Sequence, residues 1–140
     1  MDKRAQASLE YMVMLALSLG IFASILYVVS NLISTSSVQI GLDSAVRAST
    51  RLREAADFIY VHGHPSKTQI NVYIPPNVEE VSIVDNKTIN IRVSVKDAYT
   101  DIYEMAKGTV VGDLSSMGRE GYYVLSVESN PDDTINVTVV

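Results

Sequence analysis

A long run without charged side chains constrains this chain more than any other feature of its sequence. Between Glu10 and Asp43 no residue carries a formal charge. Within that run, the stretch from Tyr11 to Val29 is apolar apart from two serines and one glycine. An apolar segment of about 20 residues is long enough to span a bilayer as a helix. The sequence therefore predicts a membrane-spanning helix near its N-terminus.

The charged residues that flank this segment predict its orientation. Lys3 and Arg4 precede it, and by the positive-inside rule they keep the extreme N-terminus cytoplasmic and send the rest of the chain outward. Glu10 is unusual, because it places a carboxylate at the edge of a spanning segment. A carboxylate is costly in a bilayer, by roughly 3 kcal/mol at the centre of a spanning helix. Two interpretations stay open: Glu10 keeps its charge in the wet headgroup region, or it pairs with a cation supplied by another molecule.

A spaced polar motif opens the apolar segment. Gln6, Ser8 and Glu10 form a Gln-x-Ser-x-Glu pattern directly after the basic pair. This arrangement resembles the class III signal peptide of archaeal type IV pilins, in which a Leu stands four residues after the Glu. Here Met14 occupies that position and Leu15 follows. The resemblance covers roughly the first thirty residues of the chain.

The resemblance implies a processing route and a set of partners. A membrane-embedded prepilin peptidase would cut between Ala5 and Gln6, so that residues 1–5 are the leader and Glu10 is the fifth residue of the mature chain. The precursor would sit in the cell membrane. The mature subunit would join copies of itself or other pilins in an extracellular adhesion filament on the cell surface.

Ordinary secretion is the alternative route. A general signal peptidase would then cut after the apolar run, near the small residues Ser34 to Ser37. However, the apolar part of a secretory signal usually has about 7–15 residues, and the run in this chain is longer. The length of the apolar segment therefore favours the pilin-type route.

Small residues recur along the apolar segment. Ala16, Gly20 and Ser24 are spaced by four residues, so they share one face of a helix. Rows of small residues let helix backbones approach closely in apolar surroundings. Such residues are also common in membrane helices in general, so both helix packing and ordinary composition explain the row.

The helical pattern continues beyond the apolar segment as an amphipathic stripe. Its positions follow helical spacing and all but one are apolar; they are Val38, Leu42, Ala45, Ser49, Leu52, Ala56 and Ile59. Gly63 followed by Pro65 is a typical helix stop. If the helix stays unbroken through Ser34 to Ser37, which the sequence leaves open, it extends over residues 6–62. Its first half would then lie in the membrane or the filament core, and its second half would pack on a globular domain.

Residues 66–140 have the pattern of a β-domain. Polar and apolar residues alternate over 69–74 and 88–95, and the inward positions of the second segment are Ile89, Ile91, Val93 and Val95. Two further strands, 121–127 and 134–140, flank a turn at 130–133. Residues 98–111 are ambiguous between helix and strand, and 112–121 is predicted to be a flexible loop. The predicted fold is α+β: a long hydrophobic N-terminal helix followed by a small, mainly antiparallel β-domain, a type IV pilin-like architecture.

Composition excludes several classes of function. The chain has no cysteine, which excludes disulfides, thiol nucleophiles and thiolate metal sites. Its formal charge is −5, and removal of Asp2, Lys3 and Arg4, a net +1, would leave −6. An acidic protein is a poor ligand for nucleic acid. Nucleophile-elbow and phosphate-binding motifs are absent from the sequence, so we predict neither an enzyme nor a cofactor.

Two groups of residues are candidates for a metal site. His62 and His64 flank a glycine, but no third ligand lies close in sequence. The acidic pairs 79–80 and 132–133 lack the spaced oxygens of a calcium loop. We therefore predict no metal site and interpret these residues as surface and turn residues.

Two sequons are candidate sites of N-glycosylation, at Asn86 and at Asn136. Asn86 lies in a predicted turn, a favourable setting for an acceptor, whereas Asn136 lies within a predicted strand. Both matter only if the β-domain is extracellular.

Two classes of function fit the sequence. The first is a structural subunit of an adhesion pilus. The second is a bitopic cell-surface protein whose β-domain binds a ligand or a partner. A low-abundance pilin-like protein is a variant of the first that the sequence does not separate from a major subunit. The motif around Glu10 favours the first class.

Overall fold

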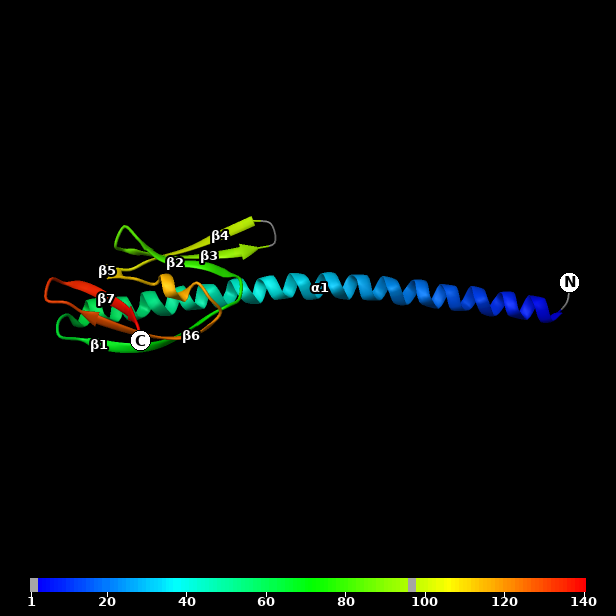
Figure 1. Cartoon of the computed structure of the whole chain (residues 1–140), viewed down its shortest axis with the longest axis horizontal. Helices are drawn as coiled ribbons and strands as arrows, with labels where there is room; N and C mark the ends of the chain where they lie inside the picture. Colours follow the sequence, from blue (N-terminus) through cyan, green and yellow to red (C-terminus); the bar gives the residue numbers. More distant parts are fainter. Residues whose placement is uncertain (1–2, 96–97) are drawn as a thin grey trace. The chain divides into compact units, whose positions relative to one another are not determined.

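The computed structural model describes residues 3–95 and 98–140, with side chains from Gln6 onward (Figure 1). One helix and seven strands follow one another as α1 Lys3–His62, β1 Lys67–Ile74, β2 Val78–Val84, β3 Thr88–Val95, β4 Ala98–Met105, β5 Thr109–Gly112, the short 3₁₀ helix η1 Ser115–Met117, β6 Gly121–Ser129 and β7 Thr134–Val139. The architecture is α+β, with a long apolar N-terminal helix followed by a small, mainly antiparallel β-domain, as predicted.

The chain divides into two compact units, which meet between Val38 and Gln39. The first unit consists of the apolar part of α1. The helix assignment continues without a break through Ser34 to Ser37, where the sequence left the continuity of the helix open. Hydroxyl side chains in this unit bond back to the helix itself, as in Thr35, whose Oγ1 donates to the carbonyl of Asn31 at 3.0 Å.

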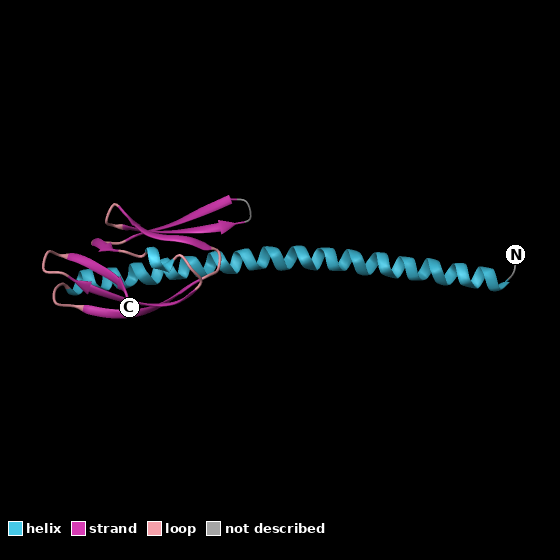
Figure 2. Ribbon diagram, in the orientation of Figure 1, coloured by secondary structure: helices cyan, strands magenta, loops and turns pink. Residues whose placement is uncertain are grey.

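The second unit consists of the rest of α1 and two sheets (Figure 2). The four-stranded sheet has the order β1-β6-β7-β5 and the three-stranded sheet the order β2-β3-β4. All strand pairs are antiparallel except β5 with β7. The predicted hairpin of β6 and β7 is confirmed, with Val127 opposite Val137.

The second half of α1 contributes one side of the hydrophobic core. Five positions of the predicted stripe are buried, namely Ala45, Ser49, Leu52, Ala56 and Ile59, while Val38 and Leu42 are only half-buried. The structure adds Gly41, Ala48 and Ala55 to the buried face. Because most of these side chains are small, strands can pack close to the helix axis.

The predicted helix stop is confirmed. Gly63 has a φ of +66° and its N–H donates to the carbonyl of Ile59 at 3.0 Å. A left-handed residue at this position satisfies a carbonyl that the helix itself leaves free, and glycine adopts it without a steric cost. The helix therefore ends at His62 for a local, sequence-encoded reason.

The inward register predicted for β3 is confirmed at its centre. Ile89, Ile91 and Val93 are at most 1% exposed, and Val95 is half-buried. Asn90 lies between two of these inward residues and so points to the opposite face, yet it is only 7% exposed. No local pattern in the sequence predicts that an outward polar residue of this strand is covered.

Residues 98–111, which the sequence left ambiguous between helix and strand, contain strand β4 and most of strand β5; Tyr99, Ile102 and Tyr103, although spaced as on a helix, lie in β4. Helical spacing was overridden by pairing, because β4 matches β3 residue for residue over its full length. The predicted flexible loop that follows is anchored in part, since Leu114 and Met117 of the η1 region are at most 2% exposed.

Candidate functional site

The first unit exposes its apolar side chains along its whole length. From Leu9 to Ile33, its large hydrophobic side chains are between 43% and 72% exposed. In the described part of the chain, α1 is the one helix long and apolar enough to cross a membrane, and its apolar window has no buried residues. Exposed apolar patches of this extent mark surfaces that lipid or protein covers.

The residues of the processing motif lie at the start of this surface. Gln6, Ser8 and Glu10 are helical and exposed, and Gln6 and Glu10 are one helical turn apart. Lys3, Arg4 and Ala5 are also helical, but their side chains lie outside the described part. A carboxylate therefore stands at the edge of an uncovered apolar helix.

The row of small residues forms a hollow in this apolar surface. Ala16, Gly20 and Ser24 lie in a shallow groove of about 900 Å³ between larger side chains such as Leu17 and Ile21. Ser24 Oγ donates to the carbonyl of Gly20 at 2.9 Å, so its polar atom has a partner within the helix. The face is therefore a shallow, open groove whose serine hydroxyl has an internal partner, and another helix can pack on it closely.

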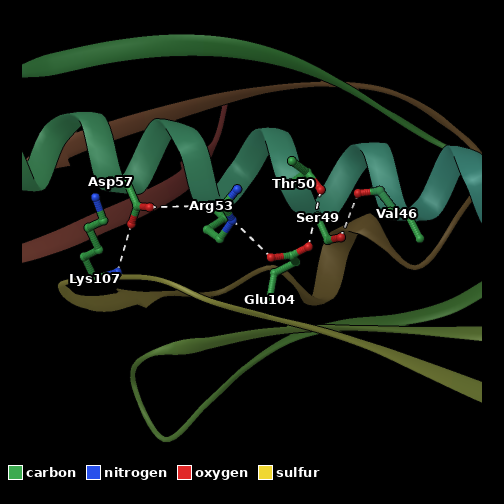
Figure 3. A network of polar contacts seen from close by, with 7 residues as sticks. All are labelled: Val46, Ser49, Thr50, Arg53, Asp57, Glu104 and Lys107. Carbon is green, nitrogen blue, oxygen red and sulfur yellow. Dashed lines mark hydrogen bonds and ion pairs between the residues drawn. The ribbon is translucent and has the colours of Figure 1, made fainter.

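A polar network fastens the second half of α1 to strand β4 and the loop after it (Figure 3). Arg53 Nη1 donates to Asp57 Oδ2 at 3.2 Å. Arg53 Nε lies 3.0 Å from Glu104 Oε2, an ion pair without hydrogen-bond alignment. Glu104 also accepts from Thr50 Oγ1 at 3.4 Å, and Asp57 Oδ1 accepts the backbone N–H of Lys107 at 2.8 Å. Of these contacts, only that between Arg53 and Asp57 joins residues one helical turn apart, a spacing that is visible in the sequence.

Polar contacts and partial burial on the sheets shift several pKa values. Hydrogen bonding to Asp101, followed by its charge, raises the pKa of Arg92. The hydrogen bond and charge of Lys67 lower the pKa of Glu128. Partial burial, followed by a hydrogen bond to Glu120, raises the pKa of Tyr73. These groups therefore keep their ordinary charge states at neutral pH, and none resembles a tuned acid or base.

The two sequons differ in accessibility. Asn86 is exposed in the turn between β2 and β3, where its φ is +52°. Asn136 is half-buried on β7, and its Nδ2 donates to Glu128 Oε1 at 3.5 Å. Only Asn86 presents its amide freely to a bulky enzyme.

The candidate metal ligands make other contacts. His62 Nδ1 lies 2.7 Å from the carbonyl oxygen of Phe58, and His64 Nδ1 lies 2.9 Å from that of Ser129. Asp132 accepts from the hydroxyl and the N–H of Thr134 in a turn. The described residues contain no cluster of three or more His, Cys, Asp or Glu that could hold a metal ion.

The second acidic pair considered as a calcium site also lies on the surface. Glu79 and Glu80 are exposed on β2, and Glu80 lies 3.8 Å from Arg92.

Comparison with known proteins returned no match among family models, curated proteins or solved structures.

Proposed function

We propose that this chain is the structural subunit of an archaeal type IV-like adhesion pilus, made as a prepilin and assembled through its apolar helix. The observation that carries the proposal is the uncovered apolar part of α1, which begins with the Gln-x-Ser-x-Glu motif and leads into a compact β-rich unit. Neither the apolar helix nor the β-rich unit is by itself specific to pilins. An ordinary membrane anchor, however, has no need of a carboxylate at its edge.

The apolar surface has to be covered by something other than water. Burial of apolar area contributes roughly 25 cal/mol per Å², and this helix exposes large side chains on every side. Lipid covers it in the precursor. In a filament, neighbouring helices replace the lipid, and the groove at Ala16, Gly20 and Ser24 provides a face for close contact.

Glu10 gives the assembly step its selectivity in this proposal. Cleavage before Gln6 creates an α-amino group, and Glu10 of one subunit pairs with that amine on a neighbour. Such a pair in apolar surroundings is hard to separate, and loss of one partner strands the other at a cost of about 3–5 kcal/mol. If Gln6 cyclises, the amine is lost and a neutral donor such as Ser8 or Tyr11 of the neighbour gives a weaker contact.

The decisive experiment replaces Glu10 with Ala in cells that make the filament. We expect the variant to be produced, inserted and cut, but filaments to be absent or sharply reduced in electron micrographs of sheared surface material. An immunoblot of the membrane fraction shows whether subunit is held there. Ser18→Ala, another exposed polar residue of the same helix, is the matched control and should assemble normally. Normal filaments from Glu10→Ala would refute the assembly role.

The leader is tested separately by intact mass and N-terminal analysis of the protein from membrane and sheared fractions. We expect a chain that begins at Gln6, either free or as pyroglutamate. A product that begins near Ser37 would instead establish ordinary secretion and remove the apolar helix from the mature protein.

The competing bitopic-receptor function predicts the opposite behaviour at Glu10. Removal of a costly carboxylate should leave a simple anchor unharmed or better inserted.

A further measurement separates two kinds of pilin. The abundance of the chain in sheared surface material distinguishes a major subunit from a low-abundance pilin-like protein.

A further inference from the structure

The three-stranded sheet β2-β3-β4 has one face in the core and one face toward solvent. Ile89 and Ile91 point into the core, so the residues that alternate with them point outward. On β4 the outward positions include Tyr99, Asp101 and Tyr103, which lie opposite Ser94, Arg92 and Asn90 of β3. We call this surface the outer face of the three-stranded sheet.

Two tyrosines stand on the outer face with most of their surface uncovered. Tyr99 is 64% exposed and Tyr103 is 60% exposed. They are four residues apart on one strand, which places their Cα atoms about 13 Å apart at roughly 3.3 Å per residue. Tyrosine combines an apolar ring face with a polar hydroxyl, a pairing enriched at binding surfaces.

The space between the tyrosines holds aligned polar groups. Arg92 Nε donates to Asp101 Oδ1 at 2.8 Å, and Arg92 Nη1 lies 3.8 Å from Glu80 Oε2. The pairing fixes the guanidinium beside the carboxylates, so that hydrogen-bond donors and acceptors lie next to each other on the face. Neighbouring hydroxyl groups, each of which both donates and accepts, are the complement of such a surface.

Asn90 provides an independent sign that a ligand belongs here. It lies directly opposite Tyr103, is only 7% exposed, and its Oδ1 has no hydrogen-bond partner. A covered carbonyl oxygen without a donor is costly. A ligand hydroxyl that reaches this oxygen beside the Tyr103 ring would supply the missing donor.

From these observations we infer that the outer face of the three-stranded sheet binds a neutral polysaccharide. The faces of the Tyr99 and Tyr103 rings cover the C–H faces of sugar units, and the polar groups between them bond to hydroxyls. Glu80 and Asp101 outnumber Arg92 on this face, which disfavours acidic polysaccharides, nucleic acid and anionic lipid. The inference does not depend on filament assembly, because the face belongs to a single chain.

The test is affinity electrophoresis of the full-length protein through gels that contain a soluble neutral polysaccharide. A mixed-linkage β-glucan, a galactomannan and an α-glucan are the probes, with alginate as the acidic comparison. The protein is held in a detergent without a sugar head group, since such a group would compete. We expect at least one neutral probe to retard the wild-type chain and alginate to have no such effect.

Variants connect the retardation to the outer face. Tyr99→Ala combined with Tyr103→Ala should weaken binding by at least about tenfold, whereas the matching Phe variants keep the ring and most of the affinity. Tyr122→Ala removes an 82% exposed tyrosine from the other sheet and should bind normally. Asn90→Ala should weaken binding without lowering the melting temperature, because it removes an unpaired buried oxygen.

Three results would overturn the inference. They are a wild-type chain that no neutral probe retards, a double Ala variant that binds like the wild type, and a preference for alginate over all neutral probes. Each can occur whether or not the chain forms filaments, so failure here is distinct from failure of the proposed function.

Discussion

Truncation of Ile91 tests the packing of the second unit most directly. Ile91 is 1% exposed and lies between Val81 of β2 and Ile102 of β4 in the three-stranded sheet. Ile91→Ala removes three carbon atoms, a loss of about 2.4 kcal/mol at roughly 0.8 kcal/mol per methylene. The cavity that remains raises the cost within a range of about 2–5 kcal/mol. For a unit of about 100 residues, 2.4 kcal/mol lowers the melting temperature by about 10–20 °C.

The assay is thermal unfolding of the full-length protein in detergent, followed by the near-ultraviolet circular dichroism of its tyrosines. Arg92→Ala, one position along the same strand, is the control. Its side chain points outward and is 41% exposed, and pairs of this kind contribute about 1 kcal/mol or less. We expect a far larger shift for Ile91→Ala than for Arg92→Ala. Equal shifts would refute the strand register and the assignment of the core face.

Three further predictions concern the polar groups of the second unit. Arg53→Ala should destabilise it by about 1–3 kcal/mol, measured by the same thermal assay, since two partly buried carboxylates lose their cation; an unchanged melting temperature would show that the network is incidental. Lys67 lowers the pKa of Glu128 in the folded protein below its ordinary value of 4.5. The Glu128–Lys67 pair therefore contributes to stability above pH 4.5, and this contribution is lost as the pH falls through the pKa of Glu128 in the folded protein. Glu128→Gln should therefore lose less stability than the wild type on acidification below about pH 4.5, and equal losses would contradict this. If the protein is N-glycosylated, peptide mass spectrometry should find the glycan on Asn86, and a glycan on Asn136 alone would contradict the accessibility argument.

Local patterns in the sequence were enough to predict much of the fold. The apolar run, the stripe from Ala45 to Ile59 and the stop at Gly63 each depend on residues within a few positions of one another. The alternation over β3 likewise placed Ile89, Ile91 and Val93 on one buried face. Such features are predictable because helix and strand periodicity are properties of short segments.

The structure alone decided which distant segments meet. Tyr99 to Tyr103 have helical spacing, yet they form a strand because β3 offers them a free edge. The contact between Arg53 and Glu104, and the covered Asn90 beside Tyr103, join residues whose proximity no local pattern encodes. The sequence by itself therefore determined the apolar helix, its motif and the core faces. Strand order and the outer polar surfaces depended on tertiary pairing, because pairing partners are selected by packing across the whole unit.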